Sequence, residues 1–90
     1  MSGTQSPSPT DWMIYILRCR DGSLYTGITK DFKRRLDQHQ KGLASRFTRA
    51  RLPVVKVYEE LGFDHSGALK REVAIKRLSR LEKVELIKKA

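Results

Sequence analysis

The amino-acid sequence predicts a small α+β domain whose elements follow the order β-β-α-β-α-α. Two short apolar runs flank an Asp-Gly turn near the start of the chain, as the strands of a β-hairpin do. A third apolar run follows Pro53, and residues that commonly cap helices precede the other segments. The 90 residues suit one domain, and no internal repeat or linker divides them.

Charge and composition limit the classes of protein to which the chain can belong. Nineteen Lys and Arg residues against ten Asp and Glu residues give a net charge of +9, which is typical of proteins that bind a polyanion such as nucleic acid. No apolar run reaches the roughly 20 residues that span a bilayer, and no signal peptide is recognisable. One cysteine forms neither an internal disulfide nor a zinc cluster. We therefore expect a cytoplasmic protein that binds nucleic acid and no membrane.

The first residues differ in composition from the rest of the chain. Residues 1–11 are rich in Ser, Pro and Thr and contain almost no apolar side chains. Such a segment buries too little apolar surface to offset the entropy lost on ordering. We therefore expect a disordered tail at 1–11 and a single domain at 12–90.

The two strands of the predicted hairpin are Trp12–Arg18 and Leu24–Thr29. A two-residue Asp-Gly turn would place Tyr15 and Tyr25 on opposite faces of the sheet, because side chains alternate along a strand. A three-residue loop with Gly22 in the left-handed region pairs Tyr15 with Gly27 and puts both phenols on one face. We favour the second arrangement, because Gly27 opposite Tyr15 would leave room for a substrate.

The segments after the hairpin predict one helix and one more strand. A helix is expected over Asp31–Lys41, with Thr29 or Asp31 as its N-cap and Gly42 as its end. The segment 42–52 has no clear periodicity, so we expect a surface loop or a short helical turn. A third strand is predicted over Val54–Leu61, ended by Gly62. The expected inward side chains of the helix are Phe32 and Leu36.

Two further helices are predicted in the last third of the chain. The first covers Gly67–Leu78, with Ser66 or Asp64 as its N-cap. The spacing of Ser79 and Glu82 is that of a capping box, so a new helix begins there and runs to about Lys88. The expected inward side chains are Leu69, Val73, Ile75 and Leu78 in the first helix, and Leu81, Ile87 and either Val84 or Leu86 in the second.

Five side chains of the chain could together carry out phosphodiester hydrolysis. Arginine stabilises the negative charge that develops at phosphorus, a carboxylate holds a divalent metal, and a phenol or imidazole orients or deprotonates water. Arg35 and His39 are four residues apart and share one helix face. The alternatives are ordinary ones: strand aromatics that pack the sheet, solvated charge on a helix, and an ion pair of Glu72 with a neighbouring lysine. The five residues are Tyr15, Tyr25, Arg35, His39 and Glu72.

The order and spacing of these residues resemble those of the GIY-YIG nuclease domain. Met13-Ile14-Tyr15 followed by Tyr25-Thr26-Gly27 is similar to the two tripeptides that give the family its name. Arg35, His39 and the segment 68–72 follow at the family's spacing, and the segment 76–83 further resembles its small, stand-alone bacterial members. Met13 and Thr26 depart from the family's tripeptides, and Ile28 stands where some members have a lysine.

The resemblance implies a fold and an activity. The fold is a three-stranded antiparallel sheet flanked by helices, and the activity is metal-dependent endonucleolytic cleavage of DNA, in repair or recombination. In the family, the counterpart of Tyr15 is a candidate general base and that of Tyr25 lines the site. The counterpart of Arg35 contacts the scissile phosphate. That of His39 contacts phosphate or assists proton transfer, and that of Glu72 binds one Mg or Mn ion.

The basic residues around the predicted hairpin are candidates for contacts to the phosphate backbone. They are Lys30, Arg34, Arg46, Arg49 and Arg51. Two other functions stay open: a nucleic-acid-binding module without catalysis, and a subunit of a larger nuclease or repair assembly. The expected oligomeric state is a monomer or a weak homodimer.

Overall fold

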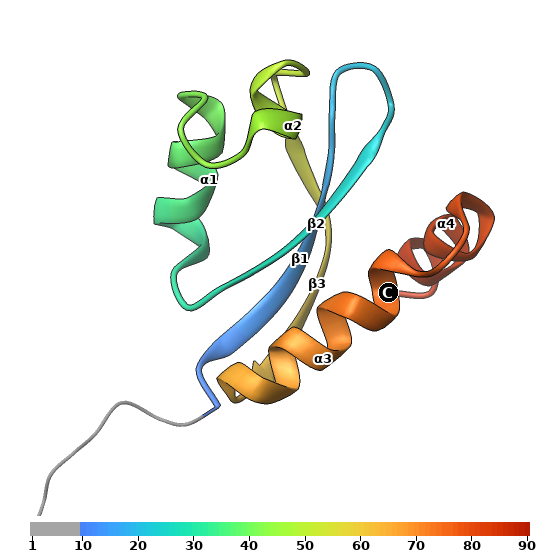
Figure 1. Cartoon of the computed structure of the whole chain (residues 1–90). Coiled ribbons are helices and arrows are strands. Elements are labelled where there is room, and N and C mark those ends of the chain that lie inside the picture. Colours follow the sequence, from blue (N-terminus) through green and yellow to red (C-terminus); the bar gives the residue numbers. More distant parts are fainter. Residues whose placement is uncertain (1–9) are drawn as a thin grey trace, which may run out of the picture.

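A computed structural model of the chain describes residues 10–90 and shows a three-stranded antiparallel sheet with helices on both faces (Figure 1). The strands are β1 (Trp12–Arg18), β2 (Leu24–Thr29) and β3 (Val55–Phe63), in the sheet order β2-β1-β3. The predicted class and order of elements are confirmed. Apart from its last two positions, the tail predicted at 1–11 lies outside the described residues.

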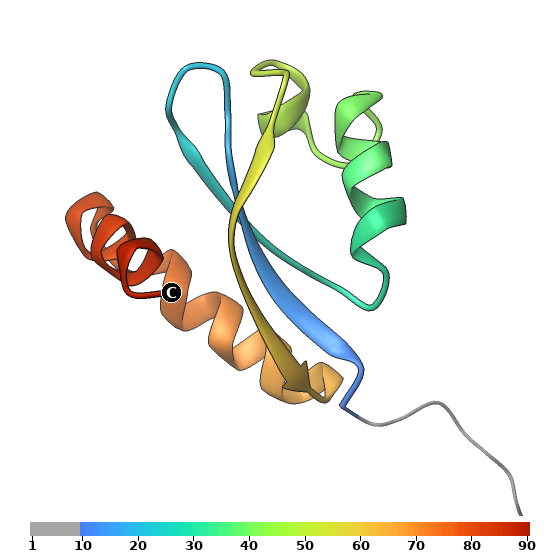
Figure 2. The ribbon, with the colours of Figure 1, turned by 180° about the vertical axis from the view of Figure 1, so that it is seen from behind.

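The helices form two groups that lie on opposite faces of the sheet (Figures 1 and 2). They are α1 (Phe32–Gln40), α2 (Arg46–Arg49), α3 (His65–Lys76) and α4 (Arg80–Lys88). Helices α1 and α2 lie on one face, and α3 with α4 lies on the other. The short helix α2 is the helical turn that the sequence left as one of two options for 42–52. Within residues 10–90, no helix is long and apolar enough to cross a membrane.

The hairpin has the predicted three-residue loop. The N–H of Cys19 donates to the carbonyl of Ser23 at 2.9 Å, and Gly22 between them has a φ of +86°. In the resulting register Tyr15 lies opposite Gly27, and Leu17 lies opposite Tyr25. The two phenols therefore share one face of the sheet, the face that α1 covers.

Strand β1 is the centre of the sheet and supplies both halves of the hydrophobic core. Its odd-numbered residues Met13, Tyr15 and Leu17 pack toward α1 together with Phe32 and Leu36, as predicted. Its even-numbered residues Ile14 and Ile16 pack toward α3 and α4, against Ile75, Leu86 and Ile87. This alternation follows from the two-residue period of a strand and explains why β1 is apolar at nearly every position.

The largest differences between predicted and observed boundaries are those of β3 and α3. Strand β3 continues through Gly62 to Phe63, although Gly62 has a φ of +89°. Helix α3 begins at His65, because the side chain of Asp64 caps it by accepting a hydrogen bond from the N–H of Gly67 at 2.6 Å. It ends at Lys76, two residues before the predicted end.

The inward face of α3 was predicted correctly at Ile75 and wrongly at Leu69 and Val73. Ala68 and Ile75 are fully buried, whereas Leu69 and Val73 are 41% and 45% exposed. Ala68 and Ile75 are seven residues apart, so they lie on one stripe of the helix. A small residue at Ala68 lets the helix approach the sheet closely.

The capping box at the start of α4 is confirmed. The hydroxyl of Ser79 accepts from the N–H of Glu82 at 3.1 Å, and the carboxylate of Glu82 accepts from the N–H of Ser79 at 2.8 Å. Leu86 and Ile87 pack against the core as predicted. Leu81 does not, because it is 79% exposed in the first turn of the helix.

The burial of α3 predicts a contrast between two apolar substitutions. Ile75→Ala should lower the free energy of unfolding by about 2–5 kcal/mol, because it leaves a cavity between α3 and β1. Val73→Ala on the exposed face should lower it by less than about 1 kcal/mol. Urea unfolding followed by circular dichroism measures both. Equal losses for the two variants would contradict the assigned inward face.

Candidate active site

A chain of buried hydrogen bonds joins β1, α1 and α2. The hydroxyl of Tyr15 lies 2.9 Å from Nε2 of His39, and Nδ1 of His39 lies 2.8 Å from Oγ1 of Thr48. The hydroxyl of Thr48 in turn donates to the carbonyl of Ser45 at 3.3 Å. Tyr15, His39 and Thr48 are 2%, 1% and 0% exposed, so bulk water is excluded from the chain.

The end of this chain fixes the direction of every hydrogen bond in it. The carbonyl of Ser45 can only accept, so the single hydroxyl proton of Thr48 points toward it. Oγ1 of Thr48 therefore accepts from Nδ1–H of His39, and Nε2 of His39 carries no proton. Nε2 then accepts from the hydroxyl of Tyr15. The imidazole is held in the tautomer that can take the phenol's proton.

Helix α1 carries His39 to this position. The carboxylate of Asp31 caps the helix by accepting from the N–H of Arg34 at 3.2 Å, and Thr29 accepts from the N–H of Asp31 at 3.1 Å. Of the two predicted N-caps, the structure uses Asp31. Gly42, with a φ of +76°, follows the helix as predicted.

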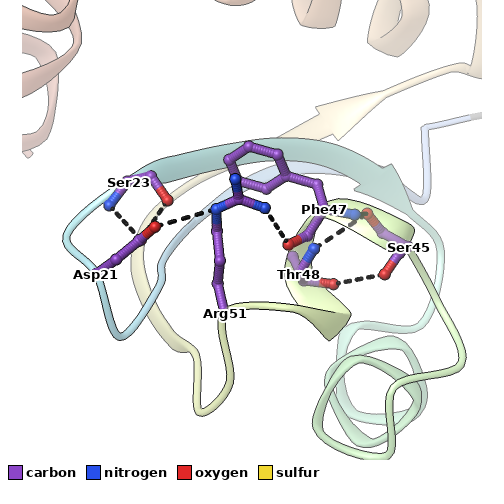
Figure 3. A network of polar contacts seen from close by, with 6 residues as sticks. All are labelled: Asp21, Ser23, Ser45, Phe47, Thr48 and Arg51. Carbon is purple, nitrogen blue, oxygen red and sulfur yellow. Dashed lines mark hydrogen bonds and ion pairs between the residues drawn. The ribbon is translucent and has the colours of Figure 1, made fainter.

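Helix α2 is held in place by the loop of the hairpin (Figure 3). The guanidinium of Arg51 donates to the carboxylate of Asp21 at 3.0 Å and to the carbonyl of Phe47 at 2.9 Å. The same carboxylate accepts from the N–H of Ser23 at 3.0 Å. Ser45 caps the other end of α2 by accepting from the N–H of Phe47 at 3.1 Å. These contacts fix the position of α2, and therefore that of the Thr48 hydroxyl, which orients His39.

Gly27 allows the phenol of Tyr15 to lie flat across β2. A Cβ at this position would stand 2.5 Å from the Tyr15 oxygen and 2.6 Å from its Cζ. The sequence prediction that this glycine leaves room for a substrate is therefore corrected, because the ring of Tyr15 itself occupies the room. Glycine is still required opposite Tyr15, because a side chain at this position would collide with the phenol ring.

Tyr25 forms the outer wall of the site on the edge strand β2. Its ring centroid lies 5.2 Å from that of His39 and 6.5 Å from that of Tyr15, and it stacks on Phe47 at 6.1 Å. Tyr25 is partly exposed, whereas Tyr15 is buried behind it. The structure thus brings together three of the predicted residues, Tyr15, Tyr25 and His39.

Burial and nearby charges keep both partners of the Tyr15–His39 hydrogen bond neutral. Burial raises the pKa of the Tyr15 phenol well above its usual value, and the neighbouring Tyr25 and Glu72 raise it further, while Arg35 lowers it. Burial also lowers the pKa of His39 below 6.5, and the positive charge of Arg35 adds to this effect. The histidine is therefore unprotonated at neutral pH and available as a proton acceptor.

The charges of Arg35 and Glu72 both act on the phenol of Tyr15, although the helices that carry them lie on opposite faces of the sheet (Figures 1 and 2). Arg35 is on α1. Glu72 is on α3, where its carboxylate is 17% exposed and lies 3.3 Å from the ammonium of Lys76. The ion pair considered from the sequence as an alternative role of Glu72 is thus present.

The position of α3, and with it that of Glu72, is fixed by the preceding residue. The guanidinium of Arg71 donates to both carboxylate oxygens of Glu60 on β3, at 2.8 Å each. Tyr58 donates to the same carboxylate. Bidentate arginine–carboxylate pairs have a narrow geometry, so this pair limits rotation of α3 against the sheet.

The residues at the site suit a hard divalent cation held by a single carboxylate. Within residues 10–90, no three His, Cys, Asp or Glu side chains gather as a metal cage. Mg is commonly held by one or two carboxylates with waters and substrate phosphates completing its shell, and Glu72 provides one such oxygen donor. A cation there would replace Lys76 as the partner of this carboxylate.

The predicted phosphate-contacting residues fall into three groups. Lys30 and Arg34 are exposed near Arg35, and all three line one groove. Arg46 and Arg49 are exposed on α2. Arg51 differs, because its guanidinium pairs with Asp21 and lies 4.0 Å from the ring centroid of Phe47. We therefore assign Arg51 a structural role in holding α2.

Sequence reasoning missed Thr48, the residue that orients His39. It lies in the segment 42–52, which has no apolar period to show which side chains face inward. The available signal was Ser45 three residues earlier, an N-cap type of residue before a short helical segment. That signal predicts a helical turn and does not predict what its third residue contacts.

The geometry predicts the protonation state of His39. At pH 7, long-range ¹H–¹⁵N NMR should show a neutral ring protonated on Nδ1, with a pKa below 6.5. Arg35→Met should raise that pKa only part of the way to 6.5, because burial remains. In the wild type, the pKa of His39 is lower in the folded state than in the unfolded state, so the unfolded state binds more protons below about pH 6.5. The stability contributed by neutral His39 is therefore complete above about pH 6.5 and is lost as the pH falls. A ring protonated on Nε2 at pH 7 would contradict the assigned direction of the chain.

The chain is similar to known proteins over most of its length. The family model of the GIY-YIG catalytic domain matches residues 11–85. A UPF0213 protein of Staphylococcus saprophyticus is 49% identical over 74 residues, which are 82% of this chain and 90% of that protein. A UPF0213 protein of Desulfotalea psychrophila is 49% identical over 78 residues, covering 86% of this chain and 71% of that protein.

Two solution structures have a similar fold. That of a UPF0213 protein of Bacillus halodurans has a TM-score of 0.56 and 38% identity, covering 86% of this chain and 82% of that one. That of a protein of E. faecalis has a TM-score of 0.56 and 35% identity, with coverages of 82% and 80%. With the matched catalytic domain, these similarities place the chain in the GIY-YIG nuclease family, among proteins similar to its small UPF0213 members.

Proposed function

We propose that this protein is a metal-dependent endonuclease that hydrolyses phosphodiester bonds in DNA. The observation that carries the proposal is the buried chain from Tyr15 through His39 to Thr48, in which the neutral Nε2 of His39 faces the phenol and can accept its proton. A phenol with a fixed proton acceptor is a general base. Arg35 and Glu72 supply charges of opposite sign, and both act on this phenol.

In this proposal, Tyr15 activates the attacking water. Its oxygen takes a proton from water while its own proton passes to Nε2 of His39, and the hydroxide attacks phosphorus. Thr48 keeps Nδ1 protonated throughout, so the proton can arrive only at Nε2. The high pKa of the phenol makes its anion a strong base once it forms. A protonated His39 cannot accept the proton, so acid should stop the reaction.

Arg35 and Glu72 contribute to the reaction through their charges. The guanidinium of Arg35 stabilises the negative charge that accumulates on the phosphoryl oxygens. The carboxylate of Glu72 holds one Mg or Mn ion, and such an ion when bound stabilises the leaving oxygen as a Lewis acid. The exposed residues Lys30, Arg34, Arg46 and Arg49 contact neighbouring phosphates without reading sequence.

Because Tyr15 is buried, Tyr25 takes part in positioning the attacking water. Tyr25 is the phenol that reaches the surface, and it stands in front of the Tyr15–His39 pair. Its assigned role is to hold the attacking water within reach of Tyr15. The reverse assignment, with Tyr25 as the base, predicts a larger loss from Tyr25→Phe than from Tyr15→Phe.

The proposal also includes a setting in the cell. The single cysteine, Cys19, is buried and unpaired, which fits a reducing cytoplasm. The net charge of +9 suits a polyanionic partner. Repair or recombination is the proposed pathway, and a monomer or weak homodimer the proposed assembly.

Cleavage of supercoiled plasmid and of a branched DNA junction tests the activity. With Mg or Mn, the wild type should cut, and EDTA should stop it. Tyr15→Phe should lower the rate by about 10²–10⁴-fold, because the general base is lost. Glu72→Ala should lower it to the level seen in EDTA. The matched control is Glu59→Ala, which removes another carboxylate paired with a lysine, at 2.6 Å, and should leave the rate unchanged.

The controls separate the possible outcomes. If Tyr15→Phe, Glu72→Ala and the wild type cut alike, the cutting is contamination and the endonuclease assignment is wrong. DNA binding that weakens with salt and survives Glu72→Ala, without any cutting, would point instead to a non-catalytic binding module.

Thr48→Val tests the positioning of His39 without changing the size of the side chain. Loss of the hydroxyl leaves Nδ1–H without its partner, at a penalty of about 1–3 kcal/mol, and frees the ring to take the other tautomer. Cleavage should fall about 5- to 150-fold, and NMR should show His39 protonated on Nε2 as well as Nδ1. Thr48→Ser keeps the hydroxyl and should restore both properties. A Thr48→Ser protein as impaired as Thr48→Val would mean that packing, and not the hydrogen bond, matters here.

A further inference from the structure

Next to the site lies a groove that combines an aromatic ring with positive charge. It has a volume of about 270 Å³, which suits a single nucleotide. It runs from the start of β1 along the end of β2 to α1. Its lining includes Trp12, Lys30, Arg34, Arg35, Gln38 and one carboxylate, that of Asp31, which caps α1. Arg35 belongs to both the groove and the site.

The indole of Trp12 is the apolar surface of this groove. The ring of His65, from the start of α3, lies at 4.5 Å from it with an angle of 42° between the planes. The ammonium of Lys30 lies 5.7 Å from the indole centroid. Trp12 is partly exposed, and a register irregularity in the β1–β3 ladder follows it. It therefore stands at the end of the sheet, between α1 and α3.

A nucleobase can take the place of Lys30 on the face of the indole. A cation over an exposed ring is held weakly, whereas a nucleobase stacked on an aromatic side chain is held more strongly. A lysine that leaves the ring reaches the phosphate attached to the same nucleotide. Aromatic platforms combined with basic grooves are the usual means of binding single-stranded nucleic acid.

The shared residue Arg35 sets the distance from the scissile bond. Tyr15 is three positions after Trp12 on β1, a rise of about 10 Å along the strand. This is the rise of about three stacked nucleotides, and of fewer in an extended strand. Because Arg35 lines the groove and its charge also acts on Tyr15, a base in the groove would lie within a few nucleotides of the cut.

We infer that this groove binds an unpaired nucleotide of the substrate, stacked on Trp12, next to the scissile phosphate. Within a duplex both faces of a base are covered by neighbouring bases, so the indole can stack only on an unpaired or terminal one. The inference rests on the proposed function and deepens it: the substrate is DNA with a single-stranded segment or branch beside the cut, not continuous duplex.

Trp12 is the only tryptophan of the 90 residues, so its fluorescence reports on this groove alone. The wild-type protein is titrated in EDTA, where nothing is cut, with oligothymidine, with a duplex that has a single-stranded overhang, and with a relaxed, covalently closed duplex circle. Oligothymidine and the overhang should quench Trp12, and the closed circle should not.

Two pairs of variants are compared by fluorescence anisotropy of labelled oligothymidine. Trp12→Leu should weaken binding about 5- to 150-fold, the range expected for one stacked base, and Trp12→Phe should weaken it less. Lys30→Ala should lower the salt dependence of binding by about one phosphate contact. Its matched control, Lys88→Ala at the far end of α4, should behave as wild type.

The outcomes separate this inference from the proposed function. Unchanged Trp12 fluorescence with oligothymidine, or equal quenching by the closed circle, overturns the inference even if the protein cuts DNA. Quenching by oligothymidine in a protein that cuts no DNA overturns the endonuclease and leaves the binding site. Wild-type affinity of a folded Trp12→Leu protein also overturns the inference.

Discussion

The hydrogen bond between Tyr15 and His39 is a constraint on most of the fold, because both groups are buried. A buried polar group left without a partner costs about 1–3 kcal/mol, a large share of the stability of a domain of this size. The imidazole has two nitrogens to satisfy, so Tyr15 on β1 and Thr48 on α2 must both meet it. The register of the hairpin, the length of α1 and the position of α2 are thereby tied to one ring.

Because Thr48 must meet His39, helix α2 has to be held in a fixed position on the face of the sheet that α1 covers. Helix α2 has only four residues and could not be stable alone. Its position comes from Ser45 at one end and from Arg51 at the other, where Asp21 of the hairpin loop receives the guanidinium. Hydrogen bonding to Ser23 and the charge of Arg51 keep the pKa of Asp21 below its usual value. An exposed loop thus helps to place a buried catalytic candidate.

The sequence predicted the fold well where the local pattern determines the structure, and poorly where packing does. Both hairpin strands and the loop follow from alternation and from Gly22, so even the shared face of Tyr15 and Tyr25 was predicted. The exposure of Leu69 and Val73 on α3 was not predicted, because both residues are as apolar as the buried Ile75 of the same helix. Their exposure depends on how closely Ala68 lets the helix approach β1. Thr48 could not be predicted either, since its contact with His39 spans nine residues without a regular period.

Two charges from different helices, Arg35 on α1 and Glu72 on α3, both act on the pKa of Tyr15. Arg35 lowers the pKa of His39 and also opposes the rise in the pKa of Tyr15, so one charge favours both the neutral acceptor and the phenolate. Glu72 acts in the opposite sense, because its negative charge raises the pKa of Tyr15. Any change that neutralises Glu72 therefore makes the phenol a readier proton donor to His39. Burial remains the main cause of the raised pKa of Tyr15, and the charge of Glu72 adds to it. The rigid pair of Arg71 and Glu60 maintains this relation, since it fixes α3, which carries Glu72, against the sheet.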